Sequence, residues 1–202
     1  MLDPVGSTSW HNRHLEYFHR LRDLLESNEI SEPTVMIVGP GGVTRLASPL
    51  LNDAATDRAS SARKLVGDLA RYGDQALRRI PGLPLRSLEP VELSRVLKTV
   101  KQMIVVDRSQ RVLAAVKRDL PDAICHCVDI SFQPIREQAD VVVAFNIVCR
   151  LEEKSAIGMA HIAEVVRPGG WLLIDDRSAE AHLTNHPEFS RVAPKTHRKA
   201  ID

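Results

Sequence analysis

The stretch from Thr34 to Gly42, TVMIVGPGG, constrains the fold of this chain more than any other. The four consecutive apolar residues 35–38, followed by a glycine turn, are typical of a strand buried on both faces, the usual state of a central parallel strand. Glycines in such a turn let backbone N–H groups approach a ligand, which suits a nucleotide or a carboxylate near the start of the next helix. We therefore expect a parallel sheet with its binding site at this turn.

The length and charge of the chain narrow its class. Its 202 residues fit one domain, 1–202, whose core needs neither disulfides nor a metal to fold. With 27 basic and 26 acidic side chains, the formal charge of +1 favours neither nucleic acid nor a membrane as a partner. No apolar stretch approaches the ~18 residues of a membrane span, and residues 1–10 lack the form of a secretion signal, so we expect a cytoplasmic protein.

The three cysteines indicate a reduced protein without a metal site. Cys125 and Cys127 fall in one predicted strand, and Cys149 follows another. Their odd number favours reduced, buried thiols over a disulfide framework. In a strand, residues 125 and 127 share one face while His126 takes the other, so the three cannot converge on one metal ion.

The first half of the chain is predicted to be largely helical around this strand. Apolar residues at helical spacing indicate an amphipathic helix within 10–30, and another helix is expected to start after the glycine turn, within 43–51. The next convincing strand ends in Asp107, 65 positions after Gly42, where about 20 are usual. Residues 54–100 are therefore a predicted helical insertion, which either packs on the sheet edge or borders the ligand as a lid.

From Asp107 onward, predicted helices and strands alternate. Helices are expected at 109–120 and 152–166, and strands at 124–128, 140–145 and 171–174. Such alternation indicates right-handed βαβ units. We predict an α/β fold, Rossmann-like and doubly wound, with a mainly parallel sheet and flanking helices.

Two aspartates end predicted strands of this sheet. Asp107, at the tip of the second strand, is placed to accept hydrogen bonds from ribose hydroxyls, or else caps the helix that begins near Ser109. Asp129, at the tip of the third strand, is placed to accept from an exocyclic amine, or else serves turn chemistry. The segment from Arg167 to Gly170, RPGG, is expected to form a sharp turn between a helix and the fifth strand.

Together, these features resemble the class I S-adenosylmethionine-dependent methyltransferases, in particular their small-molecule branch. The likeness is carried by VMIVGPGG (35–42), by the segment 103–121, by ICHCVDISF (124–132) and by the segment 139–175. The resemblance implies S-adenosylmethionine as cofactor and methyl transfer to a small-molecule acceptor. Such a reaction depends chiefly on positioning, so no catalytic motif is required. The acceptor and its nucleophilic atom stay open.

The resemblance also implies roles for single residues. Gly39 and Gly41 would approach the methionyl part of the cofactor, and Asp107 would hold its ribose. Asp129 would bind the adenine amine with Ile130 beside the ring. The acceptor and the sulfonium would lie next to the residues at the tip of the fourth strand. The implied cofactor-binding set is Gly39, Pro40, Gly41, Gly42, Asp107, Arg108, Asp129, Ile130, Phe145 and Asn146.

Further charged residues are assigned two readings each. His11 and His14 on the first helix are expected to be solvated, unless that helix folds over the cofactor and places one near the acceptor. The neighbours Asp175 and Asp176 are either solvated or act on the acceptor as a base. Arg150 either recognises an acidic substrate or pairs with the acids at 152–153.

The sequence departs from the family pattern at three points. Ile37 stands where an acidic residue is frequent, and Val43 replaces the third glycine. The 26 residues after Asp176 are expected to be too short for the antiparallel strand pair that usually ends the sheet, which leaves a shortened C-terminus. An edge left open in this way would favour a homodimer or a partner protein.

Two other functions compete with a methyltransferase. One is a degenerate methyltransferase fold that acts as a scaffold or regulatory subunit, which the departures at Ile37 and Val43 and the short tail favour. The other is a nicotinamide-dependent oxidoreductase, which shares the strand, the glycine turn and the distal acid. The RPGG segment and the lack of a Tyr-x-x-x-Lys pair disfavour this second alternative.

Overall fold

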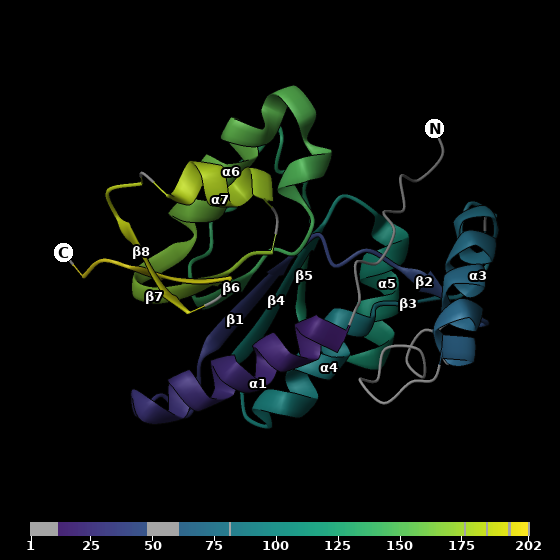
Figure 1. Cartoon of the computed structure of the whole chain (residues 1–202), viewed down its shortest axis with the longest axis horizontal. Helices are drawn as coiled ribbons and strands as arrows, with labels where there is room; N and C mark the ends of the chain where they lie inside the picture. Colours follow the sequence, from purple (N-terminus) through teal and green to yellow (C-terminus); the bar gives the residue numbers. More distant parts are fainter. Residues whose placement is uncertain are drawn as a thin grey trace.

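A seven-stranded sheet with helices on both faces forms the centre of the molecule (Figure 1). The computed structural model describes residues 12–47, 61–80, 82–175, 177–184, 186–193 and 195–201. The strand order is β5-β4-β1-β6-β7-β9-β8; the first five run parallel, and β9 is antiparallel to both of its neighbours. These strands are β1 (Thr34–Val38), β4 (Gln102–Asp107), β5 (Ile124–Cys127), β6 (Ala139–Val143), β7 (Val166–Leu173), β8 (Phe189–Ala193) and β9 (Thr196–Lys199). The predicted doubly wound, mainly parallel sheet is confirmed.

Alternate side chains of the central strands enter two separate cores. In β1, Val35 and Ile37 pack into one core and Met36 and Val38 into the other, because successive strand residues point to opposite faces. All four are at most 1% exposed, as expected for a strand covered on both sides. One core is closed by α1 (Asn12–Ser27), α4 (Leu88–Leu97) and α5 (Gln110–Asp119), and the other by α6 (Ser155–Glu164) and α7 (Arg177–Leu183) (Figure 1).

Helix α5 begins at a serine cap just after β4. The Ser109 side chain accepts a hydrogen bond from Val112 N–H at 3.3 Å and so satisfies one of the unpaired donors at the helix start. Lys117 and Arg118 lie in its last turn, where positive charge complements the helix dipole. This cap fixes the point at which the chain leaves β4, and therefore the position of Asp107.

The RPGG segment belongs to a strand and is not a separate turn. β7 begins at Val166 and includes all four of these residues, with a register shift against β6 between Ala139 and Val141. Gly169 has a φ of +75°, and a Cβ on Gly170 would lie 2.8 Å from the Asp140 carbonyl oxygen. The glycines thus allow a close backbone approach at the start of the strand.

The predicted helix at 43–51 is wrong where the structure describes it. Val43 and Thr44 instead form β2, which pairs antiparallel with β3 (Leu85–Arg86). Thr44 N–H donates to Asp74 Oδ1 at 2.7 Å, so the strand is held by the insertion and not by the main sheet. The remaining part of that prediction, 48–51, lies outside the described residues.

Within the predicted insertion 54–100 lie α3 (Ser61–Leu77), β3 and α4. Helix α4 packs against α1, whereas α3 packs near β2, away from the central strands (Figure 1). Leu65, Leu69 and Tyr72 of α3 are 61–73% exposed, although their helical spacing is that of a buried face.

The expectation that the tail is too short for an antiparallel strand pair is wrong. β8 and β9 form this pair in the last part of the chain, and β9 joins β7. The buried side chains Phe189, Thr196 and His197 fix the pair on the domain. The argument for a partner at an uncovered β7 edge therefore no longer holds.

The expected burial of the cysteines is also wrong. All three are free thiols, but Cys127 and Cys149 are exposed and Cys125 is only half-buried. Strand β5 is at the edge of the sheet, where its side chains are less covered. In the described part of the chain, no helix combines the length and apolarity needed to cross a bilayer.

Candidate functional site

A pocket lies at the carboxyl ends of the central parallel strands. β1 is the point where the strand order reverses, with β4 on one side and β6 on the other. In open α/β sheets, ligands bind outside the carboxyl ends of the strands at such a point. The space within the pocket, part of it open to solvent, is about 660 Å³.

The glycine turn forms one wall of this pocket. Gly39 and Gly41 have φ values of +63° and +65°, a left-handed conformation that favours glycine. Gly39 N–H donates to the Val106 carbonyl at 2.7 Å, which keeps the turn against β4. A Cβ on Gly39 would lie 2.5 Å from Ile147 Cδ1, so the chain after β6 packs directly on the turn. Glycine is therefore required at position 39 both by its backbone conformation and by the lack of space.

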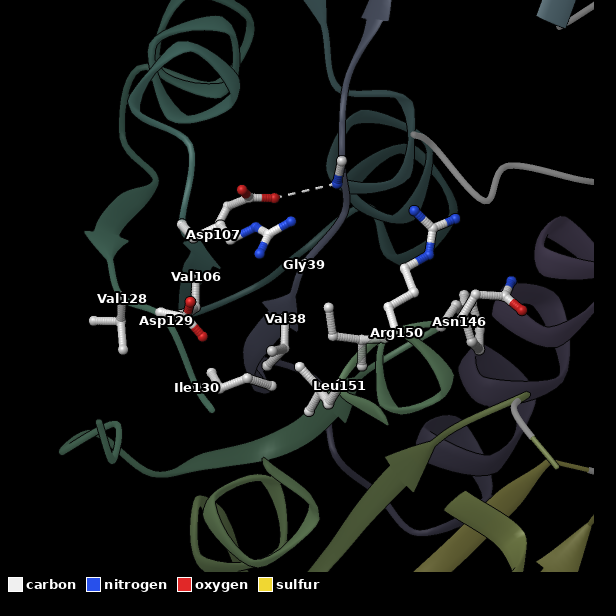
Figure 2. Close-up of a pocket in the computed structure, with 14 residues that line it drawn as sticks. Val38, Gly39, Val106, Asp107, Val128, Asp129, Ile130, Asn146, Arg150 and Leu151 are labelled. Carbon is white, nitrogen blue, oxygen red and sulfur yellow. Dashed lines mark hydrogen bonds between the residues drawn. The ribbon is translucent and has the colours of Figure 1, made fainter. Parts of the chain in front are cut away.

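Asp107 is fixed by backbone groups at the mouth of the pocket. Its Oδ2 accepts from Gly41 N–H at 3.3 Å, the dashed line in Figure 2. Its Oδ1 accepts from Ser109 N–H at 2.8 Å. The side chain is only 6% exposed. A carboxylate has about four acceptor positions, so these two bonds orient it toward the pocket without saturating it by themselves. Asp107 therefore joins the glycine turn to the start of α5 and lines the pocket, while its contact with a ribose stays a prediction.

Asp129 lies next to Asp107 at the end of β5. Its Oδ1 accepts from the N–H and the hydroxyl of Ser131, the N–H bond being 3.0 Å long. Burial opposes ionisation, but these hydrogen bonds and the charges of Arg108 and Lys154 outweigh it, so the pKa of Asp129 lies below its usual value. Both of these hydrogen bonds go to Oδ1. Ile130, 4% exposed, forms the adjacent apolar surface.

The structure brings most of the predicted site residues to this one pocket. Those that line it are Gly39, Gly41, Asp107, Arg108, Asp129, Ile130, Phe145 and Asn146. Pro40 and Gly42, which belong to the same predicted set, do not line it. They complete the turn, in which both are buried.

Sequence reasoning missed the apolar floor and one wall. Val38, Val106 and Val128 line the pocket from the ends of their strands, and their strand position was the signal that could have identified them. Ile147 and Leu151 line it from the segment around η1 (Val148–Arg150), a short 3₁₀ turn before η2 (Glu152–Lys154). The sequence predicts a helix that begins at residue 152. In the structure, residues 152–154 form η2, and α6 begins at Ser155.

Arg150 lines the pocket from the side opposite the two aspartates (Figure 2). The expected alternative, an ion pair with Glu152 or Glu153, does not occur, and among the described residues Arg150 has no ion-pair partner. The pocket therefore carries two carboxylates and the guanidinium of Arg108 on its β4–β5 side, and the guanidinium of Arg150 on its β6 side.

Asn146 is held in place by Asp175. The Asn146 backbone N–H donates to Asp175 Oδ1 at 2.9 Å, and its side-chain amide donates to Oδ2 at 3.3 Å. Asn146 has a φ of +49°, which asparagine tolerates better than most residues. Asp175 is 8% exposed, so its reading as a solvated loop carboxylate is wrong. The other residue of that pair, Asp176, lies outside the described residues.

His14 connects helix α1 to the same carboxylate. Its Nε2 lies 3.1 Å from Asp175 Oδ2 and its Nδ1 3.4 Å from Glu89 Oε1. The ring stacks on Phe145 at a centroid distance of 4.2 Å and is fully buried, so the expectation of a solvated His14 is wrong. Burial lowers its pKa, but hydrogen bonds and charges from Asp175 and Glu89 outweigh this, and the pKa lies above its usual value. His11 lies outside the described residues.

Comparison with known proteins agrees with this geometry. A family model described as "Methyltransferase domain" matches residues 89–174, from α4 to the end of β7. Residues 89–174 are therefore similar to a methyltransferase domain. Counted along the chain, the strands of its main sheet follow the order 3-2-1-4-5-7-6. The glycine turn lies before the matched residues, so the domain match rests on α4 and on the segment from β4 to β7.

Solved methyltransferase structures share the fold. The N-methyltransferase NodS from Bradyrhizobium japonicum WM9, in complex with S-adenosylhomocysteine, aligns at 11% identity over 91% of this chain and 86% of its own, with a TM-score of 0.52. Magnesium protoporphyrin IX methyltransferase from Synechocystis PCC 6803 with bound S-adenosylmethionine aligns at 8% identity over 92% and 76%, with a TM-score of 0.50. No curated protein matches the sequence significantly.

Proposed function

We propose that this methyltransferase domain binds S-adenosylmethionine in the described pocket and transfers its methyl group to a small-molecule acceptor. The observation that carries the proposal is the convergence of the Gly39–Gly41 turn, Asp107 and Asp129 at the reversal point of the sheet. Gly39 and Gly41 give room for the methionyl part, and Asp107 is oriented for the ribose hydroxyls. Asp129 Oδ2 is placed for the adenine amine, with Ile130 against the ring.

The reaction places few demands on the protein beyond orientation. When bound, S-adenosylmethionine would supply an activated methyl group to the lone pair of the acceptor. Phe145 and Asn146 border this point from the end of β6. Asp175 and His14 hold them there, which preserves the in-line geometry on which the rate depends.

Calorimetric titration with S-adenosylhomocysteine tests the proposal. The protein is expected to bind it, and Asp107→Ala to lose about tenfold or more in affinity, because hydrogen bonds to a charged group are lost. Asp140→Ala is the matched control, since Asp140 accepts from Thr34 N–H at 2.7 Å at the far end of β1. An unchanged affinity in Asp107→Ala would contradict the assigned ribose contact.

A small-molecule acceptor agrees with the nature of the neighbouring enzymes. NodS is described as an N-methyltransferase, and the Synechocystis enzyme as a methyltransferase of magnesium protoporphyrin IX. The near-neutral formal charge of +1 also offers no basic surface for nucleic acid. Whether the acceptor atom is oxygen, nitrogen, sulfur or carbon is left open by the proposal.

A scaffold without a working cofactor site is the second candidate. One observation favours it: the chain after the glycine turn is extended as β2, where a helix N-terminus would otherwise face the cofactor. The same titration separates the two candidates. Absence of binding at high micromolar ligand would favour the scaffold, and binding that depends on Asp107 would favour the enzyme.

Compartment and assembly are further parts of the proposal. The three free thiols support a reducing compartment such as the cytoplasm. The exposed Leu65, Leu69 and Tyr72 of α3 support a homodimer or a partner protein. Light scattering after size exclusion should then show a dimer that Leu69→Glu dissociates. A monomer at micromolar concentration would contradict the homodimer.

A further inference from the structure

We infer that Arg150 binds the carboxylate of the cofactor's methionyl group, so that this chain holds the amino acid end of S-adenosylmethionine through its acid and not through its amine. The inference rests on the proposed function and adds to it the residue that recognises this end of the ligand. It makes Arg150 a specificity-determining residue, because a donor or inhibitor without the carboxylate would bind less tightly.

Arg150 is the last residue of the 3₁₀ turn η1. Residues three apart on such a turn lie on one face, so Arg150 shares a face with Ile147. Ile147 Cδ1 lies 2.5 Å from the place a Cβ would take on Gly39, so this face covers the glycine turn. The hydrogen bond from Arg150 N–H to the Ile147 carbonyl, 3.1 Å long, closes the turn. Arg150 is thus built into the part of the pocket next to Gly39 and Gly41.

Charge is unevenly distributed within the pocket. Its acidic lining residues are Asp107, the last residue of β4, and Asp129, two positions after β5, on the side assigned to ribose and adenine. Across the pocket, beside the glycine turn, the charged lining residue is Arg150 (Figure 2). Ile37, in the strand below the turn, is fully buried in the core and offers no acid for an amine. A carboxylate is therefore the ligand group that this side of the pocket can neutralise.

The surroundings of the Arg150 guanidinium favour an anionic ligand. Arg150 has no ion-pair partner among the described residues, and it lies near a second guanidinium. The pKa of Arg78 lies below its usual value. Burial is the main cause, and the positive charge of Arg150 adds to it, whereas Asp74 acts in the opposite direction. Arg78 has its own ion-pair partner in Asp74, at 4.0 Å, whereas Arg150 has none among the described residues and is left to pair with an anion of the ligand. Arginine also matches a carboxylate in two parallel hydrogen bonds, which a lysine cannot make.

The test compares three ligands by calorimetry on the full chain: S-adenosylhomocysteine, its decarboxylated analogue, and 5′-methylthioadenosine, which lacks the amino acid end. The unchanged protein is expected to prefer S-adenosylhomocysteine over the decarboxylated analogue by about tenfold to a hundredfold. In Arg150→Gln this ratio should fall close to one, while the affinity for 5′-methylthioadenosine stays within about twofold. Arg150→Lys should keep part of the ratio.

Arg108→Gln is the matched control, because Arg108 lines the same pocket on the Asp129 side. It is expected to leave the ratio unchanged, whatever its effect on all three affinities. A wild-type ratio retained in Arg150→Gln would overturn the inference and assign Arg150 to an acidic acceptor. If Arg150→Gln does not fold, two other results would overturn the inference. One is an Arg150→Lys variant that prefers S-adenosylhomocysteine over the decarboxylated analogue as strongly as the unchanged protein does. The other is an unchanged protein that binds both ligands equally well. No binding of S-adenosylhomocysteine at all would instead refute the proposed function.

Discussion

Asp175 holds Asn146 at two points, accepting the backbone N–H at 2.9 Å and the side-chain amide at 3.3 Å. The two residues are 29 positions apart and end neighbouring parallel segments, β6 and β7. Through this pair, the loop after β6 is fixed at the pocket with Asn146 in a left-handed conformation. His14 adds a third contact to the same carboxylate from α1. The acceptor side of the pocket is therefore tied to the N-terminal helix.

Asp175→Ala is expected to loosen the loop after β6. Loss of the carboxylate leaves buried donors of Asn146 and His14 without this partner, which should lower the free energy of unfolding by about 1–3 kcal/mol. Hydrogen exchange should become faster in the segment 144–151, and S-adenosylhomocysteine should bind several-fold less tightly. Asp140→Ala is the control, expected to lower stability without affecting that segment. Unchanged exchange at 144–151 would contradict the role given to Asp175.

The His14 cluster is expected to make stability depend on pH. Because the pKa of His14 is raised in the folded state, its contribution is fully present below about pH 6.5, the value in the unfolded chain, and is lost as the pH rises through the folded pKa. Glu89 from α4 and Asp175 after β7 are the acids that face it. Unfolding by denaturant, measured from pH 6 to pH 9, should show that His14→Gln loses this dependence on pH. A difference between the two proteins that stays constant with pH would contradict the prediction.

Gly39→Ala is expected to disturb both the turn and the pocket wall. Its φ of +63° costs a side chain about 1–2 kcal/mol, and the new methyl group would collide with Ile147. Stability and affinity for S-adenosylhomocysteine should both fall. Gly73→Ala in α3 is the matched control, since no atom lies within 4 Å of its Cβ position. It should stabilise the protein by up to about 1 kcal/mol, and equal effects of the two substitutions would refute this account of Gly39.

Asp129 is expected to select adenine through its exocyclic amine. The unchanged protein should bind S-adenosylhomocysteine about tenfold or more tightly than S-inosylhomocysteine, in which an oxygen replaces that amine. Asp129→Ala should remove most of this preference. Asp107→Ala should weaken both ligands and keep the preference, which makes it the control. If Asp129→Ala still prefers S-adenosylhomocysteine over S-inosylhomocysteine, the adenine ring is recognised by another residue.

Much of the fold could be predicted because its central strands are continuous apolar runs. Val35–Val38, Val105–Val106 and Val141–Val143 are buried on both faces, so their residue types alone identify them. The pair β8–β9 lacks this signal: β8 is FSRVA with mostly exposed positions, and β9 is THRK. Its strands form because they pair with each other and with β7, a tertiary effect that local pattern does not report.

The candidate site could be predicted only where it follows strand ends. Asp107 and Asp129 end parallel strands, and the topology brings such residues to one edge of the sheet. The burial of His14 depends on Asp175 and Glu89, which are 161 and 75 positions away in the chain. A histidine among charged residues on a helix is usually solvated, and only the packing of α1 on Phe145 reverses this.

A crystal structure of the protein with S-adenosylhomocysteine tests the central claim most directly. The account predicts the ligand at the carboxyl ends of β1, β4 and β5, with the adenine amine on Asp129, the ribose hydroxyls on Asp107 and the carboxylate on Arg150. Ligand density elsewhere on the molecule, or an empty pocket at saturating ligand, would contradict it.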